Sequence, residues 1–87
     1  MYLEIVKKIE PNIDMEEAEV KLHIKRRLTK KEMIVLENDY QNIDEVVTLT
    51  NLSIDLDRLG SLRKSAIRKI KQKVVVDIAH AQKENVL

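Results

Sequence analysis

Apolar residues recur every three to four positions along most of this chain, with charged residues between them. That period is typical of helices with one buried side. Residues 2–9 carry the first such run, and Pro11 follows it, where a helix stops readily. Asp14 can then cap a second helix, which we expect to run to about Leu28. The start of the chain therefore predicts two helices separated by a short break.

A third helix begins with a capping box. The Thr29 hydroxyl can accept a hydrogen bond from the backbone three residues on, and Glu32 can reach back to the threonine N–H. Asn42 starts a fourth segment, which we expect to end at Gly60, because glycine adopts left-handed backbone easily. The apolar stripe expected for this fourth helix comprises Val46, Leu49, Leu52 and Leu56.

The last predicted helix has Ser61 as its cap and runs to about Lys83. Apolar residues recur along it at helical spacing, so one side of this helix should face the core. The expected inner side comprises Ile67, Ile70, Val74, Ile78 and Ala81.

Two stretches admit a second interpretation. Apolar and polar residues alternate in 20–24 and in 52–56, which is the pattern of a half-buried strand. One glycine and one proline in 87 residues leave few tight turns, however, which favours helices. We therefore expect an all-α fold, a small bundle of four to five helices with a helix-turn-helix-like C-terminal half, and keep an α/β mixture as the alternative. A chain of this length should form a single domain, with N-terminal helices in 1–40 and the helix-turn-helix-like half in 42–84.

Composition narrows the chemistry. Without cysteine there is no disulfide and no thiolate metal site. His23 and His80 lie in separate predicted helices without metal-spaced partners, so we expect no catalytic residue, no metal and no cofactor. The N-terminus is too short and too charged for a signal peptide, and no apolar run approaches the roughly twenty residues that cross a bilayer. We expect a cytoplasmic protein that is not an enzyme and does not enter a membrane.

The net charge is only +1, but the charges are unevenly distributed. Residues 14–19 carry acids without a base and 21–31 carry bases without an acid, which suits the dipole of one helix. A longer basic run without an acidic residue between its ends lies in 58–73, and apolar residues recur within it at helical spacing. Such a helix offers phosphates a local positive field, although basic helices also form solvated faces. The candidate nucleic-acid-binding residues are Arg58, Arg63, Lys64, Arg68, Lys69, Lys71 and Lys73.

Three segments carry a resemblance to a known family. They are LTKKEMIVLENDY in 28–40, TLTNLSIDL in 48–56 and AIRKIKQK in 66–73. In this order they resemble the C-terminal promoter-reading domain of bacterial sigma factors, over roughly half of the chain. The resemblance implies contact with promoter DNA, with RNA polymerase, or with both.

The position of the turn between the two helices of this motif stays open. If Leu56 ends the first helix, the turn to Ile67 is about one helical turn too long. If Leu59 and Gly60 form the turn instead, the register is nearly restored, but the match of the segment that starts at Thr48 is lost. Neither choice satisfies the whole pattern.

The physical interpretation of the motif does not need the family. The second helix of a helix-turn-helix lies in the major groove, where each base pair presents a distinct pattern of donors and acceptors. We expect this reader helix to begin near Ser61, with Arg63, Lys64 and Arg68 on its first two turns. Lys69, Lys71 and Lys73 would then contact the phosphate backbone, and Ile67 and Ile70 would anchor the helix to the domain.

A protein partner is the second hypothesis. The last helix is apolar around more than one side, and its expected partner or dimer surface comprises Val74, Val75, Ile78 and Ala81. A homodimer through 74–81 would pair two reader helices, and an adaptor or inhibitor would bind another protein there. Alternatively, this stretch lies across the other helices of the domain. We expect a small DNA-binding or transcription-associated regulator, with a helical protein–protein interaction module as the alternative.

Overall fold

The computed structural model describes residues 1–84. Its elements in chain order are α1 (Tyr2–Lys7), α2 (Glu17–Arg27), α3 (Lys30–Tyr40), α4 (Glu45–Leu52), α5 (Leu56–Lys69), the π-helical turn η1 (Ile70–Val74) and α6 (Val75–Glu84). Every regular element in this range is helical. The all-α prediction is therefore confirmed, and the two alternating stretches lie in helices and in the turn between α4 and α5.

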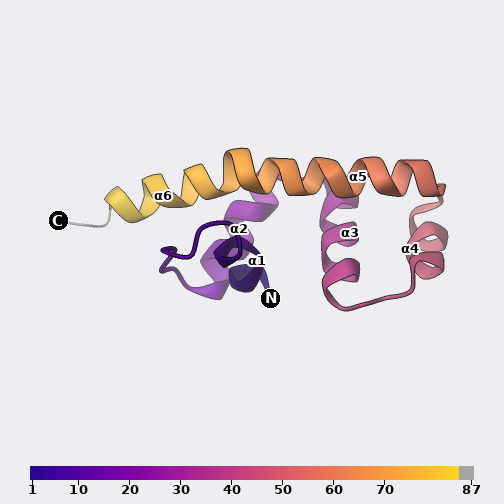
Figure 1. The fold of residues 1–87 in the computed structure, drawn as a ribbon, viewed down its shortest axis with the longest axis horizontal. Helices are drawn as coiled ribbons and strands as arrows, with labels where there is room; N and C mark the ends of the chain where they lie inside the picture. The colour runs from indigo at the N-terminus through magenta and orange to yellow at the C-terminus, as the bar shows by residue number, and fades with distance from the viewer. Residues whose placement is uncertain (85–87) are drawn as a thin grey trace.

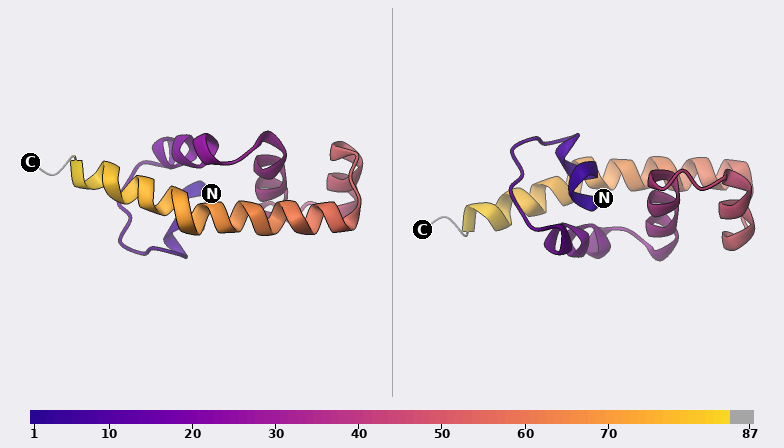
Figure 2. Two further views of the ribbon diagram at one scale, coloured as in Figure 1. Left: turned by 90° about the horizontal axis from the view of Figure 1, so that it is seen from above. Right: turned by 90° about the horizontal axis from the view of Figure 1, so that it is seen from below.

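One long helix forms the spine of the molecule. The elements α5, η1 and α6 follow one another without a break, and the other helices lie against this rod (Figure 1). At 1.5 Å per residue, residues 56–84 span about 43 Å, which is most of the 48 Å length of the structure. Two further views show α2 and the chain between α1 and α2 on opposite sides of the rod (Figure 2).

The core is divided into two clusters along this rod. The larger cluster joins α1 and α2 to the middle and end of the long helix, and comprises Tyr2, Val6, Ile13, Val20, Ile24, Leu28, Met33, Ala66, Ile70, Val74 and Ile78. The smaller cluster joins α3 and α4 to the start of α5, around Val35, Leu59 and Leu62 with partly buried Leu49, Leu52 and Ile54. The long helix contributes to both clusters, so it holds the two ends of the molecule together.

The break between α4 and α5 differs from the prediction. Gly60 ends no helix; it lies inside α5, and its backbone does not have a positive φ. The chain turns instead at Ser53, whose φ of 54° is left-handed, and Asp55 caps α5 by accepting from the Arg58 N–H at 2.8 Å. Ser61 is consequently an exposed residue within α5 and not a cap.

This earlier break also changes which residues are buried. Leu56 starts α5 and is 62% exposed, and Val46 is 65% exposed, so the stripe predicted for the fourth helix is wrong at both ends. Leu49 and Leu52 do pack against the smaller cluster. At the other end of the chain, the N-cap of α2 is Glu16 and not Asp14.

The cap at Asp55 offers a direct test of this boundary. Replacing Asp55 with alanine is expected to lower the free energy of unfolding by about 1 kcal/mol, because the Arg58 N–H loses its acceptor. Asp57→Ala is the matched control, since it removes a carboxylate from the same first turn without removing that hydrogen bond. Urea denaturation followed by circular dichroism measures both. Equal losses in the two variants would contradict a cap at Asp55.

The π-helical turn keeps the two halves of the long helix facing the same core. The buried residues of the long helix lie four positions apart and comprise Leu62, Ala66, Ile70, Val74 and Ile78. Four residues exceed one α-helical turn, so each such step would rotate the buried side by about 40°. The wider turn of η1 takes up the excess, because a π-turn holds one more residue than an α-turn. Val74 and Ile78 therefore reach the cluster that already contains Ala66 and Ile70.

Candidate nucleic-acid interface

Three basic side chains lie on the side of the long helix that faces away from its core. Lys64, Arg68 and Lys71 are four and three positions apart, and all three are exposed. Their spacing places them on one helix face, opposite the buried Leu62 and Ala66. We call Lys64, Arg68 and Lys71 the outer basic face.

The outer basic face has no acidic partner within the described part of the chain. No hydrogen bond or ion pair between side chains of residues 1–84 involves Lys64, Arg68 or Lys71. Arg58 and Lys73 are also exposed, and they lie before and after this face along the helix, on other sides of it. The cationic groups are therefore held in water, where a phosphate can approach them without first breaking an ion pair.

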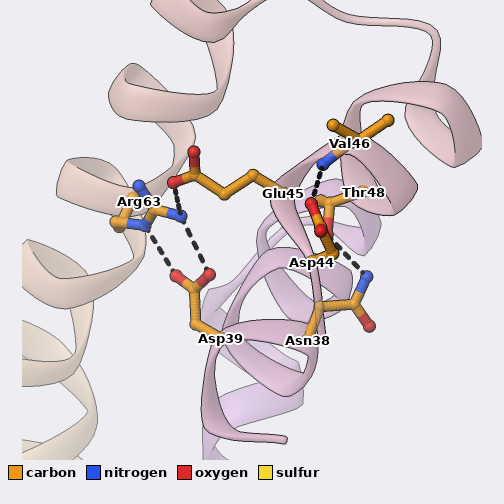
Figure 3. A network of polar contacts seen from close by, with 7 residues as sticks. All are labelled: Asn38, Asp39, Asp44, Glu45, Val46, Thr48 and Arg63. Atoms are coloured by element: carbon orange, nitrogen blue, oxygen red, sulfur yellow. Dashed lines mark hydrogen bonds and ion pairs between the residues drawn. The ribbon is translucent and has the colours of Figure 1, made fainter. Parts of the chain in front are cut away.

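Arg63 lies on a different side of α5 and joins three helices. Its guanidinium donates to both carboxylate oxygens of Asp39 at 2.6 and 2.9 Å, and to Glu45 at 3.2 Å (Figure 3). The same corner contains the Asp44 cap of α4 and a hydrogen bond from Asn38 to buried Thr48. The hydrogen bond to Asp39 raises the pKa of Arg63 above its ordinary value, so it stays charged. Arg63 therefore links α3, α4 and α5.

Lys69 is engaged on the opposite flank of the core. Its ammonium donates to the Glu32 carboxylate at 2.7 Å, and the Glu32 side chain is almost fully buried. The same carboxylate accepts from the Thr29 N–H at 2.7 Å, which completes the predicted capping box of α3. Burial alone would raise the pKa of Glu32, but its hydrogen bonds with Lys69, Ser65 and Thr29 lower that pKa to about 2. Glu32 is therefore charged inside the protein, and Lys69 is its counterion.

These contacts divide the predicted nucleic-acid-binding residues into two groups. Arg58, Lys64, Arg68, Lys71 and Lys73 are exposed. Arg63 and Lys69 hold α5 to its neighbours through ion pairs, so the interpretation of these two as contacts to nucleic acid changes to a structural role. Their carboxylate partners lie far away in the sequence, so periodicity alone does not distinguish them from the exposed cations.

The helices around this face form a helix, a turn and a helix. Three residues, Ser53 to Asp55, connect α4 to α5, and α4 lies across the end of α5 (Figure 1). A connection of this length is typical of the helix-turn-helix motif. Because α5 begins at Leu56 and not near Ser61, Lys64 lies in the middle of α5 and Arg68 in its last turn. The first turn instead carries Asp57 on the same side as Lys64.

Three apolar positions differ from their predicted roles. Val74 and Ile78, expected on a partner or dimer surface, are fully buried against α1 and α2. They cannot meet another molecule, because the chain itself covers them. Val75 and Ala81 are half-buried. Ile67, expected as an inward anchor, is 44% exposed.

Two further expectations from the sequence concern metal ligands and the membrane. His23 lies in α2 and His80 in α6, and no group of three or more His, Asp or Glu side chains suited to a metal ion forms within residues 1–84. None of the helices in this range has the length and apolar character needed to span a membrane. Comparisons of the chain with protein-family models, with curated proteins and with solved structures find no match.

Proposed function

We propose that this protein binds duplex DNA through the outer basic face of its long helix. The observation that carries the proposal is that Lys64, Arg68 and Lys71 are exposed, share one helix face and have no acidic partner in the described chain. The other two cations in the middle of this helix, Arg63 and Lys69, are neutralised by carboxylates. In the middle of the helix, between Arg63 and Lys71, the unneutralised charge is thus concentrated on one side.

The spacing of this face suits a phosphate backbone. Lys64 and Lys71 are seven residues apart, which is about 10 Å along a helix, and the major groove of DNA is about 12 Å wide. Each phosphate that a cation neutralises releases condensed counterions, and this release drives binding. Asp57 lies at the N-terminal end of the same face and repels phosphates there. We therefore place the contact on the second half of α5 and on η1, and expect it to read the backbone more than the bases.

The connection of α4 to α5 supports the same proposal. A helix-turn-helix presents its second helix to DNA while the first braces it, and α5 is held in that position by Arg63 and Lys69. A protein of this kind would act as a small transcription-associated regulator in the cytoplasm. The sigma-factor resemblance adds RNA polymerase as a second proposed partner.

The test is DNA binding across a salt series. The triple variant Lys64→Ala, Arg68→Ala, Lys71→Ala is expected to lose most of its affinity for a mixed-sequence duplex, measured by fluorescence anisotropy. The slope of log affinity against log salt should become shallower by about 2 to 3, because three phosphate contacts are lost. Arg63 is left unchanged in this design, since replacing it would also remove the link between α3, α4 and α5.

A matched control removes the same charge elsewhere. Lys7→Ala, Lys8→Ala, Lys83→Ala replaces three exposed lysines outside the outer basic face. This control should keep the affinity and the salt slope of the unaltered protein. If the unaltered protein fails to bind at low salt, or if both triple variants weaken binding equally, the outer basic face is not a DNA contact.

A further inference from the structure

A basic groove lies between α2 and α3, away from the outer basic face. It has a volume of about 470 Å³, and its lining comprises Lys21, Lys25, Leu28, Lys30, Met33, Ile34 and Glu37. The lysines come from both sides: two from α2 and one from the start of α3. Leu28, Met33 and Ile34 supply apolar surface between them. The groove thus combines positive charge at its edges with an apolar floor.

The three lysines of this groove have no carboxylate partner. No ion pair within residues 1–84 includes Lys21, Lys25 or Lys30, and all three are exposed. The Lys21 ammonium does lie 5.6 Å from the centre of the Tyr2 ring, where a cation–π interaction favours its position. By contrast, Arg27 at the end of α2 is paired with Asp77 at 2.7 Å. The positive charge left on this side of α2 therefore lies at the groove.

Glu37 does not cancel this charge. It accepts a hydrogen bond from the Tyr2 hydroxyl, so one of its carboxylate oxygens is already occupied. Burial and this hydrogen bond raise the pKa of Tyr2 to about 12, which keeps the hydroxyl protonated as a donor. One carboxylate against three ammonium groups leaves the groove positive.

The arrangement of charge favours an acidic peptide as the occupant. Lys21 and Lys25 are one helical turn apart, about 6 Å, which matches carboxylates spaced one turn apart on a partner helix. Lys30 lies on the other wall of the groove, so the peptide needs a further carboxylate on that side. The apolar floor between the lysines would be covered by a bulky apolar side chain of the peptide. A fatty acid has a single carboxylate and would leave two lysines without partners. A nucleic-acid backbone has no apolar group to cover Leu28, Met33 and Ile34.

We propose that the groove between α2 and α3 binds an acidic peptide segment of a partner protein, with carboxylates at Lys21, Lys25 and Lys30 and an apolar side chain against Leu28, Met33 and Ile34. This interaction would bring a partner to the chain without occupying α5. It does not rest on the DNA proposal, because none of the groove residues belongs to the long helix.

The test uses a short fluorescein-labelled peptide with the repeat Glu-Leu-Glu-Glu. We expect this peptide to bind the full chain, and its affinity to fall about tenfold or more in the triple variant Lys21→Gln, Lys25→Gln, Lys30→Gln. Lys7→Gln, Lys8→Gln, Lys83→Gln is the control with the same change in net charge, and it should bind as the unaltered protein does. Amide chemical shifts in two-dimensional NMR should change along α2 and the first half of α3 on addition of the peptide.

Further probes separate a fitted groove from a general attraction of charges. A peptide with serine in place of each leucine should bind about tenfold more weakly, because the apolar floor is then left uncovered. The protein variant Ile34→Ser should weaken binding of the leucine peptide and leave the serine peptide unaffected. Equal binding of the two peptides, or unchanged affinity in the lysine triple variant, overturns the proposal. Binding of sodium laurate or a DNA duplex at these amides, with no binding of the leucine peptide, also overturns it.

Discussion

Replacing Lys69 with methionine is expected to lower the free energy of unfolding by about 3 kcal/mol at neutral pH. The Lys69 ammonium lies 2.7 Å from the Glu32 carboxylate, whose side chain is only 3% exposed. Truncating one member of a buried ion pair typically costs about 3 to 5 kcal/mol, because the other charge stays buried without a partner. The lower end applies here, since the Lys69 side chain is 19% exposed and water reaches this edge of the pair.

The loss should depend on pH in a way that identifies its cause. In the unaltered protein the pKa of Glu32 is lowered from 4.5 to about 2, so its carboxylate contributes stability above about pH 4.5. That contribution disappears as the pH falls from 4.5 toward 2, because the unfolded chain binds the proton first. In the Lys69→Met variant, burial is opposed by fewer hydrogen bonds, and the pKa of Glu32 rises. The stability difference between the two proteins should therefore be largest at neutral pH and should narrow below about pH 4.

Two companion variants complete the measurement. Lys71→Met removes an exposed lysine from the same helix and should change the free energy of unfolding by less than about 0.5 kcal/mol. Adding Glu32→Gln to Lys69→Met removes the uncompensated charge and should restore at least half of the loss. Urea denaturation at several pH values measures all of these. A loss in Lys69→Met that is no larger than in Lys71→Met, or that does not change with pH, would show that the pair is not buried as described.

Local signals in the sequence predicted several helices well. The capping box of Thr29 and Glu32 starts α3 as expected, because both of its hydrogen bonds form between residues that are three positions apart. The inner side of the last helix was also predicted at Ile70, Val74 and Ile78, since these apolar residues recur at four positions, which is close to the helical period. Such features depend on the chain within one or two turns, and the sequence contains that information directly.

The boundary between α4 and α5 could not be predicted in the same way. Glycine often ends a helix, but the backbone at Gly60 is not left-handed. The helix α5 continues through this residue, and residues of α5 both before and after it are buried in the core. Ser53 does adopt left-handed backbone, although serine has no special preference for it. Aspartate is a common N-cap residue, but the sequence has aspartate at both Asp55 and Asp57. The residue type alone therefore does not show which of the two caps α5.

The candidate site shows the same division between local and distant information. Lys64, Arg68 and Lys71 share a face because of helical spacing alone, so their grouping follows from the sequence. The roles of Arg63 and Lys69 depend on Asp39 and Glu32, which precede them by 24 and 37 residues. No periodic pattern connects residues at such separations. The groove of Lys21, Lys25 and Lys30 likewise depends on how α2 and α3 are placed next to each other, although the three lysines all belong to the basic run of 21–31 that the sequence shows.

Deleting Gln72 is expected to leave the protein folded, with a free energy of unfolding within about 1 kcal/mol of the unaltered chain. Gln72 is exposed and lies within η1, where one residue more than an α-helical turn is accommodated. Without it, Val74 and Ile78 would follow Ile70 at three and seven positions, which is the regular spacing of a buried helix face. The long helix could then run as an α-helix throughout while the same side chains face the core.

Deleting Ser61, which is also exposed, should instead cost more than about 5 kcal/mol or abolish cooperative unfolding. The deletion turns Leu62 and Ala66 by about 100° away from the core, and it draws Arg63 and Lys69 away from their carboxylates. If the helix shifts at its start instead, Leu59 leaves the smaller cluster and Asp55 loses its position as cap. Circular dichroism and urea denaturation compare the two deletions. If both deletions lower the free energy of unfolding equally, η1 does not hold one residue more than a regular α-helix would. The four-residue spacing of the buried side chains would then be accommodated along the whole helix.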